Sequence, residues 1–293
     1  MGGVVDGFPS GFKIDFDALD CMMVERRPGH RAEPDKVEFL SGIIDGVTLG
    51  TPIAFIIRNV DAHTEDYDNL RHTYRPSHAD ITYDMRYGIR DYRGGGRASG
   101  RETVSRVVAG ALAMQWLAHY HNVSIDSSII GTIPMIAETV PMIDSVGGIV
   151  HCSVKGMPRG KGDPVFHKLQ ASLAEAMLSI PACKGFQYGK GFSAAAMRGS
   201  DHNDPMHYTE DGTLIFDKND AGGLLGGITT GEEIYFDVVF KPTPSIAIPQ
   251  QTVTDDCQNT TLTIHGRHDR CIANRAAVVV RAMTALVLMD YCL

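Results

Sequence analysis

The sequence predicts an α+β fold, a β-α-β sandwich in which antiparallel sheets enclose central helices, with an internal pseudo-two-fold repeat. Three observations indicate this fold: a glycine pattern that occurs four times, apolar runs of strand length after two of its copies, and a C-terminal segment that is apolar on nearly every side. No low-complexity linker divides the 293 residues. We therefore expect one compact domain over 1–293, with two repeated halves at about 1–125 and 149–293.

The glycine pattern consists of two apolar or small residues, one variable residue and then Gly-x-x-x-Gly. It occurs at 4–11, 43–50, 153–160 and 224–231. The second and fourth copies also share a threonine and a following Ile-x-Phe at one constant offset. Glycine is common in this chain, so the four copies can be unrelated turns. A match that continues from the turn into a strand favours a duplicated unit instead.

Hydrophobic periodicity predicts the main helices and strands. Strand-like apolar runs lie at 52–59 and 233–242. Helices are expected at 16–29, 103–117, 165–181 and 274–291, of which the first ends at Pro28-Gly29 and the third at Pro181. The residues expected to face the core from the first three are Phe16, Leu19, Met22, Met23, Val104, Val107, Val108, Ala111, Leu112, Phe166, Leu169, Leu173, Met177 and Ile180. The last helix is apolar nearly all round, so we expect it at the centre of the molecule.

Charge and cysteine content exclude several classes of protein. The formal net charge of −8 argues against a general nucleic-acid or membrane-surface role. The six cysteines form no CxxC pair, so we expect a reducing cytoplasm and cysteines that serve as small buried hydrophobes. Arg275, Arg281 and Asp290 interrupt the apolar C-terminal run, which is therefore unsuited to spanning a bilayer.

A glycine turn rich in arginine, RDYRGGGRASGRET at 90–103, carries the clearest functional signal. Consecutive glycines leave backbone N–H groups accessible to a ligand. Ser99 stands three residues before Glu102 and ahead of a helical pattern, which predicts a capping box with Ser99 as N-cap. A helix N-terminus with arginines beside it suits a phosphate or a carboxylate. The alternative is a glycine loop with solvated arginines. GxxxxGK[ST], a complete dinucleotide fingerprint, HExxH and GxSxG are all absent.

Other segments carry groups suited to proton transfer or to anions. His78, flanked by Arg75 and Asp80, can exchange a proton near neutral pH, or it can be a structural histidine. Asp269 can be the N-cap of the last helix or a carboxylate that faces a site. The segment 240–245 ends a strand with a lysine and hydroxyl groups, which again suits an anion.

Taken together, these segments resemble the chorismate synthase family. The resemblance is carried, in the family's order, by RRPG (26–29), the stretch 65–103, GDPVFHKL (162–169), AMLSIPACKG (176–185), DAGGLLGGITTGEE (220–233), KPTPS (241–245) and GRHDRCIANRA (266–276). The part from Arg75 to Thr103 is the most specific. The resemblance implies a carbon–oxygen lyase of the shikimate pathway, in aromatic amino acid biosynthesis. Its reaction is a 1,4-anti elimination of phosphate from 5-enolpyruvylshikimate 3-phosphate to give chorismate, which requires reduced FMN without net redox change.

The resemblance also implies roles for individual residues. His78 corresponds to a histidine that protonates the reduced flavin, and Asp269 to a carboxylate near the flavin N5 atom. Residues implied to hold FMN are Arg97, Ala98, Ser99, Pro181, Ala182, Gly226, Lys241, Pro242, Thr243, Pro244, Ser245 and Arg267. Those implied to bind the substrate are Arg26, Arg27 and Arg101, with NADPH as an alternative ligand of Arg26. A cytoplasmic homotetramer is implied, with NADPH as a candidate reductant and with no metal, nucleic-acid or membrane partner.

The sequence departs from the family pattern in several places. A family Ser-His pair, whose histidine is implied to protonate the leaving phosphate, precedes the matched region, so we expect it either outside this sequence or missing from the protein. The segments 27–34 and 132–148 are shorter than the family's. Pro181 replaces a usual asparagine, and Pro244 interrupts a run of hydroxyl residues. A flavin-binding or phosphometabolite-binding relative with impaired catalysis is therefore a second hypothesis. A structural or RNA-associated protein is a third, which the acidic net charge disfavours.

Overall fold

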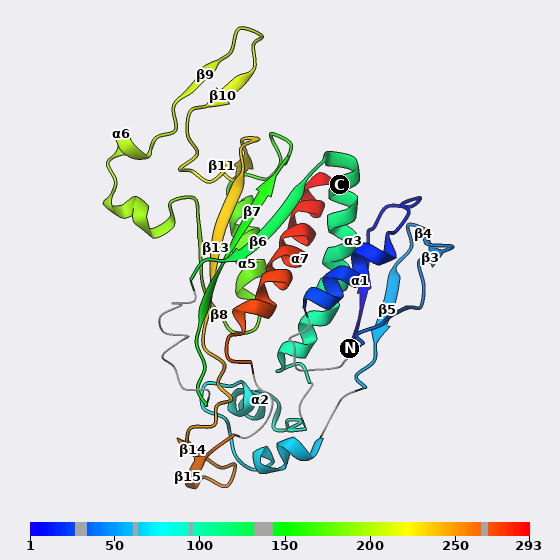
Figure 1. The fold of residues 1–293 in the computed structure, drawn as a ribbon, viewed down its shortest axis with the longest axis vertical. Helices are drawn as coiled ribbons and strands as arrows, with labels where there is room; N and C mark the ends of the chain where they lie inside the picture. Colours follow the sequence, from blue (N-terminus) through cyan, green and yellow to red (C-terminus); the bar gives the residue numbers. More distant parts are fainter. Residues whose placement is uncertain (27–33, 61–63, 94–95, 132–142, 265–268) are drawn as a thin grey trace.

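The structure is a computed structural model that describes residues 1–26, 34–60, 64–93, 96–131, 143–264 and 269–293. In its body, helices α1, α3, α5 and α7 lie between two antiparallel sheets (Figure 1). The helices are α1 Phe16–Glu25, α2 Asp80–Tyr87, α3 Thr103–His121, α5 Leu169–Leu178, α6 Gly199–His202 and α7 Ala273–Cys292, with 3-10 turns η1 Thr64–Leu70, η2 Gly100–Glu102 and η3 Gly191–Ala196. The predicted α+β sandwich is confirmed.

The two main sheets differ in size. One has the strand order β1-β5-β2 and the other the order β6-β7-β13-β8, and all neighbouring strands are antiparallel. Their strands are β1 Gly2–Val5, β2 Val37–Phe39, β5 Ile53–Ile57, β6 Ser124–Ile129, β7 Gly148–Lys155, β8 Cys183–Tyr188 and β13 Ile234–Phe240. Side chains on β5, β7 and β13 are buried at every second position, so one face of each sheet packs on the helices. The remaining strands pair as hairpins: β3 Ile43–Ile44 with β4 Val47–Thr48, β9 Met206–Tyr208 with β10 Leu214–Phe216, β11 Leu224–Leu225 with β12 Ile228–Thr229, and β14 Gln250–Val253 with β15 Asn259–Leu262.

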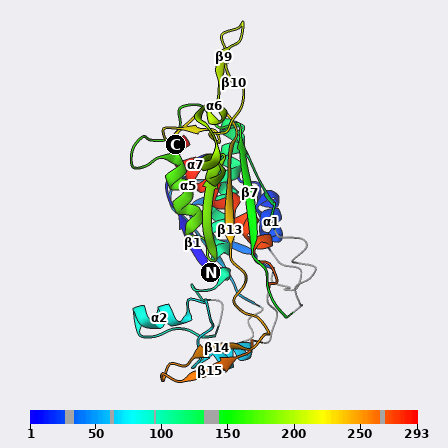
Figure 2. The ribbon, with the colours of Figure 1, turned by 90° about the vertical axis from the view of Figure 1, so that its left-hand side faces the viewer.

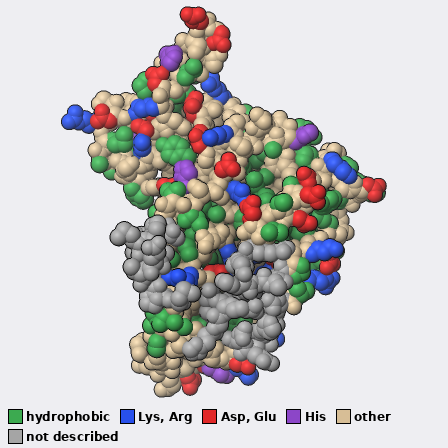
Figure 3. All heavy atoms as spheres, viewed as in Figure 1, with side chains coloured by type: hydrophobic (Ala, Val, Ile, Leu, Met, Phe, Trp, Pro, Cys, Tyr) green, Lys and Arg blue, Asp and Glu red, His purple; other side chains and the backbone are tan. Residues whose placement is uncertain are grey.

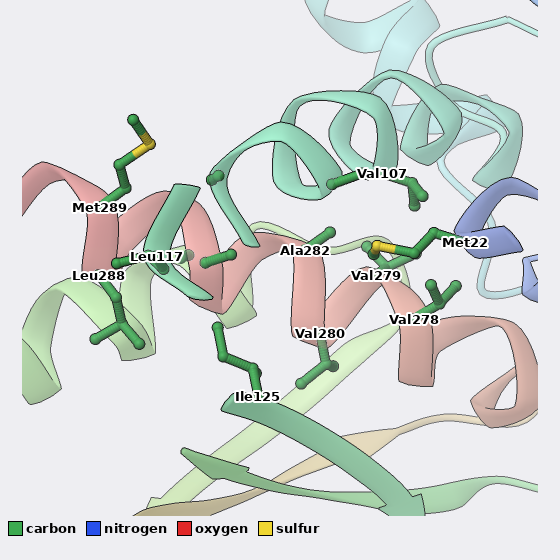
Figure 4. Packing of buried hydrophobic residues seen from close by; sticks show 14 of the residues in the cluster. Met22, Val107, Leu117, Ile125, Val278, Val279, Val280, Ala282, Leu288 and Met289 are labelled. Atoms are coloured by element: carbon green, nitrogen blue, oxygen red, sulfur yellow. The ribbon is translucent and has the colours of Figure 1, made fainter. Parts of the chain in front are cut away.

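Helix α7 lies at the centre of the molecule, as its all-round apolar sequence predicts. It is buried against α3 on one side and against the larger sheet on the other, where Val280 lies near Ile125 of β6 (Figure 4). At the closest approach of the two helices, a Cβ added at Gly110 would lie 2.4 Å from both Cα and Cβ of Ala282. Only glycine allows this helix crossing, because a real Cβ would overlap the partner backbone.

Substituting this glycine tests the crossing. We expect Gly110→Ala to lower the free energy of unfolding by about 1–3 kcal/mol, because α3 and α7 must separate to admit the methyl group. Chemical denaturation measures the loss. Gly199→Ala in α6 is the matched control, since a Cβ there meets nothing within 4 Å, and it should unfold as the unchanged protein does. Equal stability of the Gly110 variant would mean that the helices are not packed this closely.

Two expected core residues are in fact exposed. Leu19, Met22 and Met23 of α1 are buried as predicted, but Phe16 is 41% exposed because it stands in the first turn, just after the N-cap Asp15. Phe166 is 85% exposed because α5 begins only at Leu169. All the other residues expected to face the core are buried. The expected end of the first helix at Pro28-Gly29 lies outside the described residues, although the regular part of α1 already ends at Glu25.

The repeated glycine pattern corresponds to the same local structure in both halves. Thr48 is buried in the β3-β4 hairpin, where its hydroxyl donates to Pro9 O at 2.6 Å and accepts from Phe12 N at 3.0 Å. Thr229 is buried in the β11-β12 hairpin, where its hydroxyl donates to Pro158 O at 2.6 Å and accepts from Lys161 N at 2.9 Å. In each half, the threonine of one pattern copy therefore ties down the turn of the other. The bounds of the two halves stay a prediction.

The cysteines differ in their exposure to solvent. Cys152 and Cys292 are buried, whereas Cys21 and Cys257 are exposed, so the expectation that all six cysteines are buried is wrong. Cys21 lies on the outer face of α1, and Cys257 in the turn between β14 and β15.

Among the described helices, none combines the length and the apolar character that a membrane crossing requires.

The two ends of the sandwich carry different structures. The β9-β10 hairpin projects from one end, whereas α2 and the β14-β15 hairpin lie at the other (Figures 1 and 2). Charged side chains of both signs are interspersed among the described residues on the face shown in Figure 3. Most residues of the candidate site lie at the end that carries α2.

Candidate active site

Lys241 joins three segments that are distant in sequence. It directly follows β13, its backbone N–H donates to Ala182 O at 3.0 Å, and its ammonium group donates to Ser77 O. Burial, together with the charge of Lys184, lowers the pKa of Lys241. The structure therefore brings together three of the expected site segments: 181–182, 241–245 and the turn that carries His78.

His78 is held by charged neighbours in a tight turn before α2. Its side chain is 15% exposed, and its Nδ1 atom lies 2.8 Å from Asp80 Oδ1 and 3.1 Å from Arg75 Nη2. Arg75 also donates to the Asp80 carboxylate from its Nε at 2.8 Å and its Nη2 at 2.9 Å. Burial would raise the pKa of Asp80, but the hydrogen bonds from Arg75 and His78, and their charges, outweigh it and hold that pKa well below its usual range. His78 thus stands beside a carboxylate that is ionised at neutral pH.

Residues 145–146 hydrogen-bond to both the loop after Lys241 and the segment before α7. Thr243 O accepts from Ser145 Oγ at 2.7 Å, and Arg270 O accepts from Val146 N at 2.8 Å. Ser145 and Val146 therefore link the 241–245 loop to Arg270, the residue next to Asp269. The Asp269 carboxylate pairs with Arg275 at 3.0 Å, and the N-cap of α7 is Ile272. Of the two interpretations of Asp269, the N-cap is therefore wrong.

The arginines at 90, 93, 97 and 101 do not form one basic cluster. Arg90 pairs with Asp84 at 3.1 Å, Arg93 pairs with Asp91 at 2.8 Å, and Arg101 pairs with Asp35. Arg97 is exposed and makes no ion pair with any described residue. It is therefore the one of these four guanidinium groups whose charge is not matched by a carboxylate within the described part of the chain.

Ser99 begins the helical segment, but the predicted capping box is only half formed. The Ser99 hydroxyl accepts from Arg101 N at 3.1 Å, because the first turn, η2, is a 3-10 turn that brings this N–H nearest. The Glu102 carboxylate does not return to Ser99 and accepts instead from Arg106 Nε at 3.1 Å. The N-cap position is confirmed, and the reciprocal glutamate contact is wrong.

Arg26 and Arg101 are buried around a single carboxylate. Asp35 is 2% exposed and lies between the two guanidinium groups, 3.5 Å from Arg26 Nη1 and hydrogen-bonded to Arg101 Nη1. Arg26 also donates to Gly100 O at 2.9 Å and to Thr103 Oγ1 at 3.2 Å. Two residues implied to bind substrate anions thus hold the end of α1 against the start of α3. Arg27 and Arg267, the other implied arginines, lie outside the described residues.

Arg106 connects the start of α3 to Ser179, which lies just before the 181–182 segment that contacts Lys241. Besides Glu102, it donates to Ser179 Oγ at 2.7 Å and to Ser179 O at 3.1 Å. Ser179 comes two residues before Pro181. The side chain of Arg106 therefore links Glu102, which follows the loop that carries Arg97, Ala98 and Ser99, to the residue before the 181–182 segment.

Gly226 lies apart from these residues. It follows β11 and lines a cavity of about 700 Å³ between α5, β8 and η3, together with Phe186, Tyr188 and Phe192. β13 runs from this end of the sheet to Lys241, and its seven residues span about 20 Å. Within one chain, the structure does not bring Gly226 together with Lys241.

The residues around Lys241 fit a phosphorylated aromatic cofactor such as FMN. The hydroxyl of Thr243 is buried and has no hydrogen-bond partner among the described residues, so it is available to bond a ligand. Arg97 and Ser99 supply donors for a phosphate, and Lys241 supplies a donor for the polar edge of a ring system. The methyl side chains of Ala98 and Ala182 belong to half-buried residues and can face a ring system. Arg97 would hold the phosphate end, and Lys241 and Thr243 would contact the polar edge.

Two residues of this region gave no functional signal in the sequence. Asp35 precedes a strand in an otherwise ordinary stretch, and its two arginine partners are 9 and 66 positions away. Arg106 stands on an amphipathic helix, where a charged residue is usual. Neither occurs in a motif that marks it. Only the packing of α1, α3 and α5 identifies them.

The chain is similar to proteins of one family over its whole length. The family model described as chorismate synthase matches it in two segments, 1–134 and 131–293. Proteins named chorismate synthase from Phocaeicola vulgatus and Christiangramia forsetii are 44% and 46% identical to it, each over 99% of this chain and over 92% and 91% of their own lengths. The protein of that name from Synechocystis sp. is 41% identical over all of this chain.

A solved structure shows the same similarity. A crystal structure of a chorismate synthase superposes with a TM-score of 0.75 at 25% identity, over 99% of this chain and 87% of that one. The alignment with the Phocaeicola vulgatus relative spans 329 positions against 293 residues here, which is consistent with the shortened segments noted in the sequence. These full-length matches show that the chain belongs to the chorismate synthase family.

Proposed function

We propose that this chain catalyses the chorismate synthase reaction with reduced FMN bound around Lys241, Thr243 and Arg97. The reaction is the elimination of phosphate and a ring hydrogen from 5-enolpyruvylshikimate 3-phosphate. The observation that carries the proposal is that Ala182, Lys241 and the Ser77–His78 turn converge on one hydrogen-bonded group. His78 supplies a proton-exchanging group there, and Lys241 supplies positive charge.

The protein's own residues would act by charge, orientation and proton transfer. Arg97 and the N–H groups near Ser99 would bind a phosphate, and the oxygen and nitrogen atoms of Lys241 and Thr243 would fix the ring orientation. His78 would hold or release a proton at Nε2, the ring nitrogen that is not bonded to Asp80. Arg26, Arg27 and Arg101 are proposed to neutralise the substrate's anionic groups, and Asp269 to lie near the reacting atoms. When bound, reduced FMN supplies electron density to the substrate as the phosphate leaves and takes up the hydrogen.

Anaerobic turnover is the direct test. The full chain is incubated without oxygen with photoreduced FMN and 5-enolpyruvylshikimate 3-phosphate, and chorismate is measured by its absorbance and by chromatography. We expect chorismate only when the protein, the reduced flavin and the substrate are all present. Binding of FMN and substrate without turnover would favour the impaired relative. If neither ligand binds, the proposed function is wrong.

Substituting Arg97 tests the proposed phosphate contact. We expect Arg97→Ala to weaken FMN binding by about 10-fold to 100-fold, the loss that follows removal of a charge-assisted hydrogen bond. Stability should not change, because the side chain is exposed and unpaired among the described residues. Fluorescence titration with FMN measures the affinity. Arg93→Ala is the control, since Arg93 is exposed on the same loop but pairs with Asp91. Unchanged FMN affinity in the Arg97 variant would remove Arg97 from the site.

The assembly and the reductant are proposed on family resemblance. We propose a cytoplasmic homotetramer that acts on a small-molecule substrate, without a nucleic-acid or membrane partner. NADPH is the proposed source of electrons for the flavin. A second copy would also bring a Gly226 to the site, since the Gly226 of the same chain lies at the far end of β13. Light scattering after gel filtration measures the mass in solution, and NADPH oxidation in the presence of FMN measures the reductase activity.

A further inference from the structure

The tautomer of His78 follows from the groups that face its Nδ1 atom. Asp80 Oδ1 lies 2.8 Å away and Arg75 Nη2 lies 3.1 Å away. An ionised carboxylate only accepts hydrogen bonds, whereas a guanidinium only donates them. Nδ1 can therefore either donate its proton to Asp80 or accept one from Arg75, and it cannot do both.

The carboxylate decides between these two possibilities. Arg75 already donates to Asp80 three times, from its backbone N at 3.1 Å, from Nε at 2.8 Å and from Nη2 at 2.9 Å. With Asp80 ionised by these contacts, an Nδ1 lone pair directed at Oδ1 over 2.8 Å would be repelled. Nδ1 therefore carries a proton in both charge states of the ring. The neutral ring then has its free lone pair on Nε2.

Asp80 is itself held rigidly. It is the first residue of α2 and its side chain is 6% exposed. Arg90 also lies 3.9 Å from Asp80 Oδ1, and its guanidinium donates to Leu70 O at 2.6 Å. Two hydrogen bonds hold the turn that carries His78: Lys241 donates to Ser77 O, and Arg75 O accepts from His78 N at 3.2 Å. The carboxylate cannot follow the ring if the ring rotates.

We propose that Asp80 is a positioning residue of the active site, which keeps the proton on Nδ1 of His78 and thereby makes Nε2 the atom that exchanges a proton. The inference rests on the proposed role of His78 in the reaction. When Nε2 takes up a proton, Nδ1 keeps its hydrogen bond to the Asp80 carboxylate, which stays ionised throughout. When Nε2 releases the proton, the same neutral tautomer is restored. Each cycle therefore returns the ring to one defined state.

The state of the ring can be observed directly in the unchanged protein. Magic-angle-spinning NMR of protein labelled with ¹⁵N-histidine distinguishes a protonated from an unprotonated ring nitrogen, and the signals of His78 among the 12 histidines are those lost in His78→Gln. We expect the neutral His78 ring to be protonated at Nδ1. Protonation of the neutral ring at Nε2 instead would overturn the inference, regardless of the activities measured for the variants.

The matched variants are Asp80→Asn and Asp84→Asn, which change carboxylates one turn apart on the same helix. Asp84 contacts Arg90 and not His78. We expect Asp80→Asn to lower kcat at least about 10-fold and to populate the Nε2–H tautomer, because an amide can donate to Nδ1. KM for the substrate and FMN affinity should change by less than about two-fold, since Asp80 touches neither in this assignment. Asp84→Asn should keep both the tautomer and kcat.

The outcomes separate this inference from the proposed function. If the unchanged protein forms no chorismate, the proposed function fails, although the NMR result still tests the tautomer. If the unchanged protein is active and Asp80→Asn, folded by circular dichroism, keeps its kcat and its tautomer, the positioning role fails alone. A rise in KM with an unchanged kcat would also contradict it, because it would indicate a binding role.

Discussion

We expect His78→Ala to lower kcat for chorismate formation by about 10²-fold to 10⁴-fold, the contribution typical of a positioned acid or base. FMN affinity should be nearly unchanged, because the imidazole is assigned to proton exchange and its Nδ1 is already bonded to Asp80 at 2.8 Å. Anaerobic stopped-flow measurement of chorismate formation gives kcat, and flavin fluorescence gives the affinity. The loss of kcat should exceed that of Asp80→Asn. His78→Ala removes the imidazole that exchanges the proton, whereas Asp80→Asn removes only the carboxylate that orients it.

His72→Ala is the control for this experiment. His72 lies on the same segment and also pairs with an aspartate, Asp255 at 2.9 Å, but its side chain is 67% exposed. It should be as active as the unchanged protein. A His78 variant with full activity would remove the residue from the reaction, and a variant that lost FMN binding to the same extent as activity would assign it to binding.

We expect Asp35→Asn to lower the free energy of unfolding by about 3–5 kcal/mol, the typical cost of breaking a buried ion pair from one side. Asp35 is 2% exposed and faces both Arg26 and Arg101, so removing one negative charge affects two buried guanidinium groups. Asparagine keeps the shape and tolerates the left-handed backbone at this position, where φ is 44°, so the change isolates the charge. Denaturant unfolding followed by circular dichroism measures it.

Asp45→Asn is the matched control. Asp45 has a similar φ of 50°, but it is exposed. Its substitution should shift stability by no more than about 0.5 kcal/mol. If Asp35→Asn unfolded at the same denaturant concentration as Asp45→Asn, the two arginines would have to be neutralised by other groups. Their arrangement at the start of α3 would then not depend on Asp35.

Much of the fold was predictable from local patterns. The all-round apolar segment before the C-terminus became α7, and the face of Val104, Val107 and Ala111 became the buried side of α3. Hydrophobic periodicity indicates these elements because burial requires one face or all faces to be apolar. Phe16 and Phe166 were misplaced because they continue a pattern past the point where the chain enters or leaves a helix. Periodicity does not mark that boundary.

The candidate site was predictable only in part. Motif resemblance pointed to His78, Lys241 and Arg97, and contacts join the first two through Ser77. It did not indicate that three of the four arginines near the triple glycine pair with carboxylates, which leaves Arg97 unmatched among the described residues. Charge partners are set by distance in space, and Asp35 stands 66 positions from Arg101. A sequence displays charges without displaying their partners.

The amino-acid order alone indicated the four long helices and two of the core strands, the recurrence of the glycine pattern, and the family motifs that the chain carries. All of these depend on residues that are near one another along the chain. Only the tertiary structure decided which nitrogen of His78 faces Asp80, that Asp35 lies between two arginines, and that Gly226 lies at the opposite end of β13 from Lys241. These relations depend on how closely α1, α3, α7 and the four-stranded sheet pack, since hydrogen bonds and ion pairs act over a few ångströms.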